Sequence, residues 1–352
     1  AQDQLQLAAS MSVEGNSLRI INHTGHKLIT GYPEGRRIWP NIKWYDQQGT
    51  LIRDDGAYGA LEVTINGTPQ TVRSVLDLGA PNTRIYEAHM GMTQEWAVQL
   101  VGFGVSPDLP LEYDRRDGSI VHTLGDLAEM PPGTSLPTFH FVLNNTVYND
   151  NRIPPFGMNA EEARRRNAAP VSHGSEALYE VDEKGQYPYY DTIELNPPIE
   201  AVSAEIKLLY QPTSWEYVQF LNLANDGSSA FLGQEGANML EAWLNTGMAE
   251  PFVMAEANWG DKQQECEAET ENPDGCRGQL EATVTILETG RWLRKKGWNS
   301  KSYFQATSKF AAGEKIIVRL GIQDEQDEAL SEASVTLDIS GPQAISLTSP
   351  ES

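Results

Sequence analysis

Short runs in which apolar and polar residues alternate recur along most of this 352-residue chain, and they constrain its fold more than any other feature. Two of these runs flank Asn66-Gly67, the strongest short signal for a tight β-hairpin. The clearest candidate strands lie at 17–22, 37–46, 50–55, 61–66, 69–78 and 201–211, with 95–103 and 136–148 also of strand composition. The chain is therefore predicted to be mainly β, built from β-sandwich modules with a few short helices.

Three segments have helical rather than strand spacing. Residues 160–169 follow Pro154-Pro155 and precede Pro170, so a short helix is expected between these breakers. Apolar residues recur at helical spacing over 214–224, with Ser214 as a candidate N-cap. Residues 238–247 form the third candidate, closed by Gly247. All three are predicted to be packing elements.

A change in composition divides the chain into 1–257, 258–278 and 279–352. The middle segment is polar and acidic and contains both cysteines, so it is predicted to be a linker or a stapled loop. Beyond it, evenly spaced strand candidates predict an Ig-like β-sandwich; they lie at 279–288, 301–310, 314–324 and 331–340. A break near 154–180 would divide the first part into two sub-domains.

The two cysteines, Cys266 and Cys276, are predicted to form a disulfide. Nine residues separate them, and a turn signal at 272–275 would bring the sulfurs together. A disulfide indicates an oxidising compartment. Two free thiols or half of a metal site are the alternatives, although a zinc site would require closer cysteine spacing and more soft ligands. The first ten residues lack the pattern of a signal peptide, so we expect that a leader has been removed or that the chain is a piece of something longer.

The charge of the chain argues against nucleic acid as a partner. It has 26 basic and 49 acidic residues, a net charge of −23 that repels phosphate backbones. No apolar run approaches the roughly 20 residues of a membrane-spanning helix, so no transmembrane segment is predicted.

Sequence motifs of enzymes are missing. There is no GxSxG elbow, phosphate-binding loop, GxGxxG, HExxH or EF-hand loop. Because no CxxCH is present, this chain would not attach a c-type haem covalently. An enzyme is therefore the interpretation with the least support.

Two sets of residues are candidate metal ligands. His23 and His26 stand three apart and would converge on one ion, such as copper. Alternatively, one of them would reach a haem iron held by a neighbour, or both would bond locally as surface histidines. The acidic loop would offer hard oxygen ligands for calcium or remain solvated; its candidate residues are Asp261, Glu265, Glu267 and Asp274.

The most distinctive stretch, 21–52, reads INHTGHKLITGYPEGRRIWPNIKWYDQQGTLI. It resembles the haem-free C-terminal region of large bacterial multihaem c-type cytochromes. Further segments match the same family in the same order, at 139–157, 187–195, 207–221, 241–247 and 250–254. The resemblance covers roughly residues 1–256 and is more specific for family membership than for activity.

The resemblance implies a β-rich module that packs beside haem-bearing segments of an exported electron-transfer protein, in the periplasm or at the surface of a bacterium. It marks His26 as the residue most able to approach a haem. Arg36 and Arg37 would pair with haem propionates or neighbouring carboxylates, or would support the adjoining turn of Tyr32, Pro33, Glu34 and Gly35. Residues 149–152 resemble a loop held by side-chain hydrogen bonds.

The sequence lacks the haem-bearing part of that family. It would thus be a cleaved or separately encoded module that binds a cytochrome subunit, or a module that has lost the electron-transfer role. The first hypothesis is a non-catalytic extracytoplasmic module that packs against a multihaem c-type cytochrome and contacts its haem c. The alternatives are an exported copper- or calcium-binding protein and a cell-surface adhesion or carbohydrate-binding module.

Overall fold

The computed structural model describes residues 2–28, 32–173 and 179–260, together with four short strands further along the chain. The chain divides into two compact units, Ala1–Glu265 and Cys266–Ser352. In the second unit β15 (Gly290–Leu293) pairs with β16 (Tyr303–Ala306), and β17 (Thr336–Ile339) pairs with β18 (Ile345–Thr348). Strands β16 and β17 fall within two of the predicted strands, and the predicted strands at 279–288 and 314–324 lie outside the described residues.

Strands dominate the first unit, which confirms the mainly β prediction, and every described strand pair is antiparallel. The strands are β1 (Ala9–Glu14), β2 (Ser17–Asn22), β3 (Arg37–Tyr45), β4 (Leu51–Asp55), β5 (Tyr58–Ile65), β6 (Thr68–Val75), β7 (Tyr86–Thr93), β8 (Pro110–Tyr113), β9 (Ile120–Thr123), β10 (Ser135–Pro137), β11 (Thr146–Asp150), β12 (Tyr190–Glu194), β13 (Ser203–Gln211) and β14 (Phe252–Gly260). The helices are α1 (Gln2–Gln6), α2 (Gln94–Gly102), α3 (Leu124–Glu129), α4 (Ala160–Arg165), α5 (Trp215–Leu223) and α6 (Glu235–Asn245).

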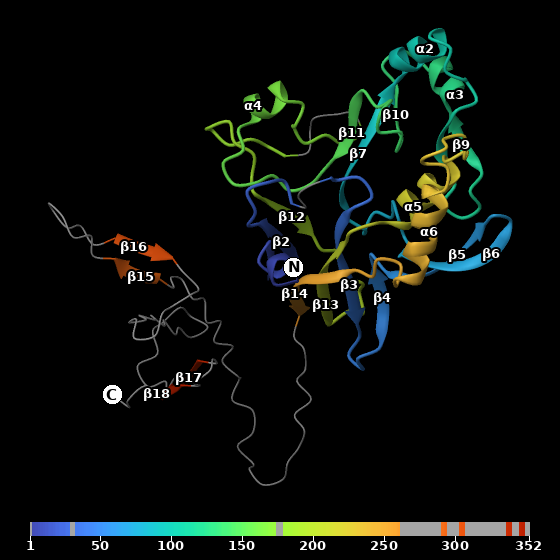
Figure 1. The fold of residues 1–352 in the computed structure, drawn as a ribbon. Coiled ribbons are helices and arrows are strands. Elements are labelled where there is room, and N and C mark those ends of the chain that lie inside the picture. Colours follow the sequence, from blue (N-terminus) through green and yellow to red (C-terminus); the bar gives the residue numbers. More distant parts are fainter. Residues whose placement is uncertain are drawn as a thin grey trace. The chain divides into compact units, whose positions relative to one another are not determined.

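Two sheets form the central sandwich of the first unit (Figure 1). The larger has the order β10-β7-β3-β13-β14, with β11 beside β7 and β4 beside β3, and the smaller has the order β1-β2-β12. Their facing side chains share one core, in which Leu18 and Ile20 of β2 meet Ile42 and Trp44 of β3 and Ile206 of β13. One face of β3 contributes to this core, and the opposite face packs against the β5–β6 hairpin, so the strand is buried on both faces.

Two helices pack on the β5–β6 hairpin, which is a separate two-stranded sheet. Helices α5 and α6 lie beside the β5–β6 hairpin (Figure 1), where Trp215 and Trp243 pack on Leu61 and Val72. Ser214 caps α5, as predicted, since its hydroxyl accepts the N–H of Tyr217. No helix among the described residues is long and apolar enough to cross a membrane.

The strand predicted at 95–103 is wrong, because this segment is helix α2. Trp96, Val98 and Leu100 alternate with polar or small residues, but the buried positions are Ala97 and Leu100, three apart, as in a helix. The strand predicted at 136–148 is correct only at its ends, which belong to β10 and β11, and a turn occupies its centre.

Candidate functional site

The turn after β2 presents His26 to solvent. Asn22, only 2 % exposed, donates from its side-chain amide to the carbonyl of His26 (2.8 Å) and to that of Ile153 (3.0 Å). Its Oδ1 accepts the backbone N–H of Thr24 (2.8 Å). One buried amide therefore closes the turn and attaches it to a segment more than 100 residues away. The His26 imidazole is exposed and makes no hydrogen bond with the described residues.

His23 lies on the same turn, in different surroundings. Its Nε2 is 2.7 Å from the hydroxyl of Ser10 on β1, a hydrogen bond whose direction depends on the tautomer. Within residues 2–28, 32–173 and 179–260, no group of three or more His, Cys, Asp or Glu side chains is arranged to hold a metal ion. The other candidate ligands and the two cysteines lie outside the described residues; these are Asp261, Glu265, Glu267, Asp274, Cys266 and Cys276.

A groove of about 480 Å³ begins at His26, and we call it the His26 groove. Its apolar lining includes Pro33, Met90, Val147 and Met158. It adjoins a second hollow of about 610 Å³, with which it shares Met90, Val147 and Asn167; polar residues such as Asn144, Asn145 and Arg164 make up much of the lining of this second hollow. A concave surface that combines apolar residues with an exposed histidine is a candidate binding site.

The buried side of the groove holds an ionic cluster. The Lys27 ammonium lies 2.7 Å from Oδ2 of Asp150, and both side chains are 9 % exposed. Arg152 donates to the two oxygens of the same carboxylate, at 2.7 and 2.8 Å. Although burial opposes ionisation, these two cations hold the pKa of Asp150 below its usual range. Residues 149–152 are thus held by side-chain bonds, and Lys27 was not identified from the sequence.

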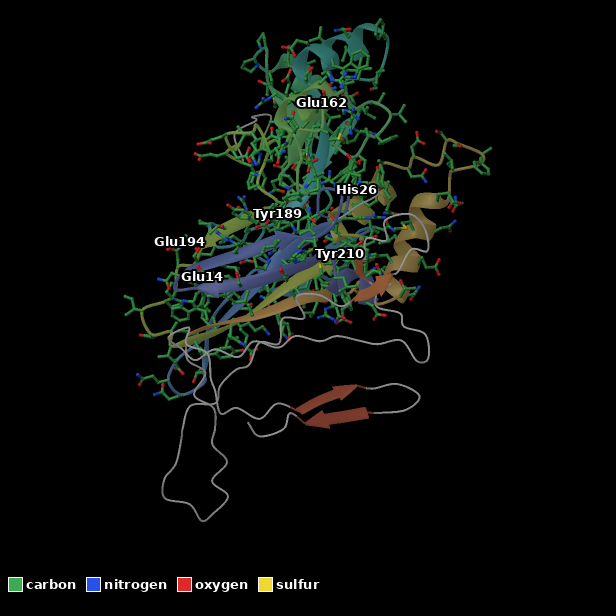
Figure 2. All side chains as sticks on the ribbon, turned by 90° about the vertical axis from the view of Figure 1, so that its left-hand side faces the viewer. Glu14, His26, Glu162, Tyr189, Glu194 and Tyr210 are labelled. Carbon is green, nitrogen blue, oxygen red and sulfur yellow. The ribbon has the colours of Figure 1, made fainter. Side chains whose placement is uncertain are left out.

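Exposed aromatic residues continue the surface beyond the groove. Phe156 is 78 % exposed and meets the ring of Tyr189 edge to face, with 5.2 Å between centroids. Tyr189 directly precedes β12, and its carbonyl accepts the N–H of Asn22, so these rings lie next to the His26 turn. The positions of His26 and Tyr189 are labelled in Figure 2. We call His26, its groove and the two aromatic rings the His26 face.

Arg37 does not contribute to the His26 face. It is 2 % exposed, and its guanidinium bonds to Gln211 (2.9 Å), Ser74 (2.9 Å) and Glu216 (3.2 Å) inside the protein. Its partners are therefore internal, and one of them, Glu216, is a neighbouring carboxylate of the kind expected from the sequence. The backbone N–H of Arg36 donates to the carbonyl of Pro33 (3.1 Å), within the turn.

The turn at 32–35 is held from two sides. The Glu34 carboxylate accepts the hydroxyl of Tyr32 (3.0 Å) and the backbone N–H of Met90 (3.2 Å). Burial raises the pKa of Glu34, although both hydrogen bonds act in the opposite direction. Gly35 has a φ of +75°, and a Cβ at this position would lie 2.6 Å from the ring of Tyr217, so the turn requires glycine.

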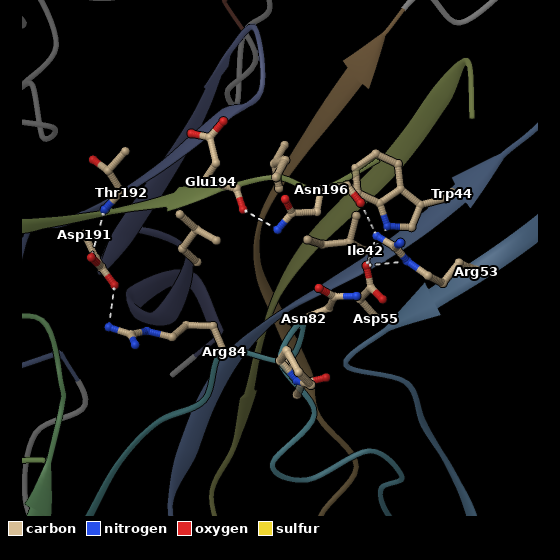
Figure 3. Close-up of a pocket in the computed structure, with 14 residues that line it drawn as sticks. Ile42, Trp44, Arg53, Asp55, Asn82, Arg84, Asp191, Thr192, Glu194 and Asn196 are labelled. Carbon is tan, nitrogen blue, oxygen red and sulfur yellow. Dashed lines mark hydrogen bonds and ion pairs between the residues drawn. The ribbon is translucent and has the colours of Figure 1, made fainter. Parts of the chain in front are cut away.

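A separate cavity of about 340 Å³ lies between β3, β4 and β12 (Figure 3). Its charged groups bond to one another: Arg53 lies 2.9 Å from Asp55, and Arg84 lies 3.1 Å from Asp191. The hydroxyl of Tyr86 on β7 also donates to Asp191 on β12 (2.8 Å). Arg53 and Asp55 lie on the same strand, whereas the bonds of Asp191 to Arg84 and Tyr86 join β12 to the larger sheet and the segment before β7, so we assign this cavity a structural role.

Comparisons with known proteins identify no family for this chain. Its sequence matches no described protein family and no curated protein. Among solved structures, the chain is similar to a penta-heme cytochrome c552 from Thermochromatium tepidum, with 9 % sequence identity and a TM-score of 0.31. The match covers 74 % of this chain and 41 % of that chain, so it spans less than half of that cytochrome. At this identity and TM-score the likeness establishes neither a family nor a function.

Proposed function

We propose that this protein is a non-catalytic module, located outside the bacterial cytoplasm, that packs against a multihaem c-type cytochrome through the His26 face. One observation carries the proposal: the His26 imidazole is exposed and makes no hydrogen bond with the described residues, while its turn is fixed by a buried asparagine. Imidazole is a common axial ligand of haem iron. A fixed turn reduces the entropy lost when the side chain is immobilised on binding.

The surroundings of His26 support the same partner. A porphyrin edge is flat and apolar, and the groove offers Pro33, Met90 and Val147 beside the imidazole. Phe156 and Tyr189 provide exposed rings of the kind that are enriched at protein interfaces. Covering a haem edge with such a surface excludes water and lowers the local dielectric constant, which changes the reduction potential of the iron.

The test is to isolate the tagged full-length chain from its native cells and to record its absorption spectrum. We expect a c-type haem spectrum to accompany the wild-type chain and to be lost with His26→Ala. His23→Ala is the matched control, because it removes an imidazole from the same turn, and it should retain the haem spectrum. A colourless wild-type preparation, or equal haem content in the two variants, would contradict the proposal.

A further inference from the structure

Another cavity, of about 520 Å³, lies on the opposite face of β7 from the His26 groove. Successive residues of a strand point to opposite faces. Ala88 and Met90 line the His26 groove, and His89 between them lines this second cavity. The two cavities share no lining residue. We call the second one the Arg115 cavity, and a ligand bound in it would be independent of the His26 face.

The walls of the Arg115 cavity are largely apolar. Phe220 of α5 meets Phe139 edge to face at 5.4 Å and Tyr113 of β8 at 5.6 Å. Leu111 and Val121, from the β8–β9 hairpin, add aliphatic surface. A volume of several hundred cubic ångströms with mostly apolar walls and a few polar groups is typical of a small-molecule site. The walls therefore favour a ligand with an aromatic or branched aliphatic body.

Arg115 supplies the polar end of the cavity. Its Nη2 donates to the hydroxyl of Ser74 (2.9 Å) and to the carbonyl of Val75 (2.8 Å), and lies 2.8 Å from a carboxylate oxygen of Glu216. Its Nη1 makes no hydrogen bond with the described residues, and its Nε is buried without a partner. The guanidinium is thus fixed in place with donors unused, an arrangement that suits recognition of a carboxylate.

The carboxylates that line the cavity leave Arg115 available to an anion. Glu216 is shared between Arg115 and Arg37, which lies 3.2 Å from its other oxygen. Asp114 accepts two backbone N–H groups of the following turn. Glu112 is 44 % exposed, so solvent screens its charge. Two of the three carboxylates are thus compensated by ion pairs or hydrogen bonds and the third is screened by solvent, so none of them occupies the free Nη1 donor of Arg115.

We propose that the Arg115 cavity binds a small organic acid with an aromatic or branched aliphatic body. Its carboxylate would accept hydrogen bonds from Arg115, and its body would lie against Phe139 and Phe220. His89 lies beside the ring of Phe139, with 5.7 Å between centroids. Burial lowers its pKa, but the carboxylate of Glu87 outweighs this and raises the pKa, which favours the protonated form of the imidazole.

The test is calorimetric titration of the full chain with 3-phenylpropionate and with the corresponding neutral amide. We expect the acid to bind and the amide to bind at least about tenfold more weakly, because the amide offers no charged acceptor to Arg115. Absence of acid binding to the wild-type chain at millimolar concentration would overturn the proposal. Equal binding of acid and amide would overturn the role of Arg115.

Two pairs of matched variants locate the site. Arg115→Gln should abolish acid binding, and Arg116→Gln, which removes the same charge from the exposed neighbouring residue, should not. Val121→Trp should fill the cavity from the hairpin, whereas Ile120→Trp changes an exposed residue that does not line it. If Arg115→Gln fails to fold, the tryptophan pair decides, and unchanged affinity in Val121→Trp would place the acid elsewhere and overturn the proposal.

Discussion

Replacement of Asp150 by asparagine is expected to destabilise the protein by about 3–5 kcal/mol, the usual cost of leaving a buried charge without its partner. Lys27 lies 2.7 Å from the Asp150 carboxylate, and both side chains are 9 % exposed. The asparagine keeps the size of the side chain but not its charge. The Lys27 ammonium is then buried without the carboxylate that compensates it.

Two further variants calibrate this value. Lys27→Met leaves Asp150 paired with Arg152, so it should cost less than Asp150→Asn. Glu162→Gln removes an exposed carboxylate that pairs with Arg165 at 2.6 Å, and it should cost only about 0–1 kcal/mol. Urea unfolding followed by tryptophan fluorescence measures all three as shifts in the transition midpoint at constant slope. A loss in Asp150→Asn no larger than that in Glu162→Gln would refute the reasoning.

The pH dependence tests the same cluster. The pKa of Asp150 is depressed in the folded protein, so its stabilisation is fully present above the unfolded value of about 4. This stabilisation is lost as the pH falls through the lower folded value. Asp150→Asn should therefore be less sensitive to acid than the wild-type chain, as measured by the change in midpoint between neutral and acidic pH.

Gly49→Ala should lower the free energy of unfolding by about 1–2 kcal/mol, because a φ of +74° strains an L-residue even where the surrounding space is open. Gly35→Ala should lower it further, because the added Cβ would also meet the ring of Tyr217. Urea midpoints measure both, and equal losses would contradict the close approach seen at Gly35. Glu87 raises the pKa of His89 despite its burial, so the stabilisation from this pair is full below about pH 6.5 and is lost as the pH rises through the raised value. Glu87→Gln should remove this decline from a plot of Tm against pH, and an unchanged profile would refute the assignment.

The elements predicted correctly from the sequence are those whose signals are local. Asn66 and Gly67 both have positive φ, at 50° and 75°, as the central residues of a tight hairpin turn require. The dipeptide alone therefore located the β5–β6 turn.

Helix α2, which was predicted as a strand, nevertheless has a local start signal in its sequence. Thr93 caps it by accepting the N–H of Trp96, and Glu95 lies in its first turn.

The candidate site could be predicted only in part, because contacts between distant residues complete it. The sequence identified His26 and the loop that contains Asp150, but not the bond between that loop and Lys27, which joins residues 123 positions apart. The same holds for the attachment of Asn22 to Ile153, across 131 positions. Periodicity and turn signals describe neighbours along the chain, so they contain no information about such pairs.

Strand β7 shows why the two proposed sites depend on one register. Ala88 and Met90 face the His26 groove, and His89 faces the Arg115 cavity. In β11, Val147 pairs with Met90 and Asn149 pairs with His89, so Tyr148 is an extra residue that forms a β-bulge opposite this part of β7. A shift of β7 by one residue would exchange its two faces and would place His89 in the groove. The alternating sequence of β7 does not by itself show which of its faces His89 lies on. The pairing with β11, in which Val147 lies opposite Met90 and Asn149 opposite His89, sets the register and therefore the face.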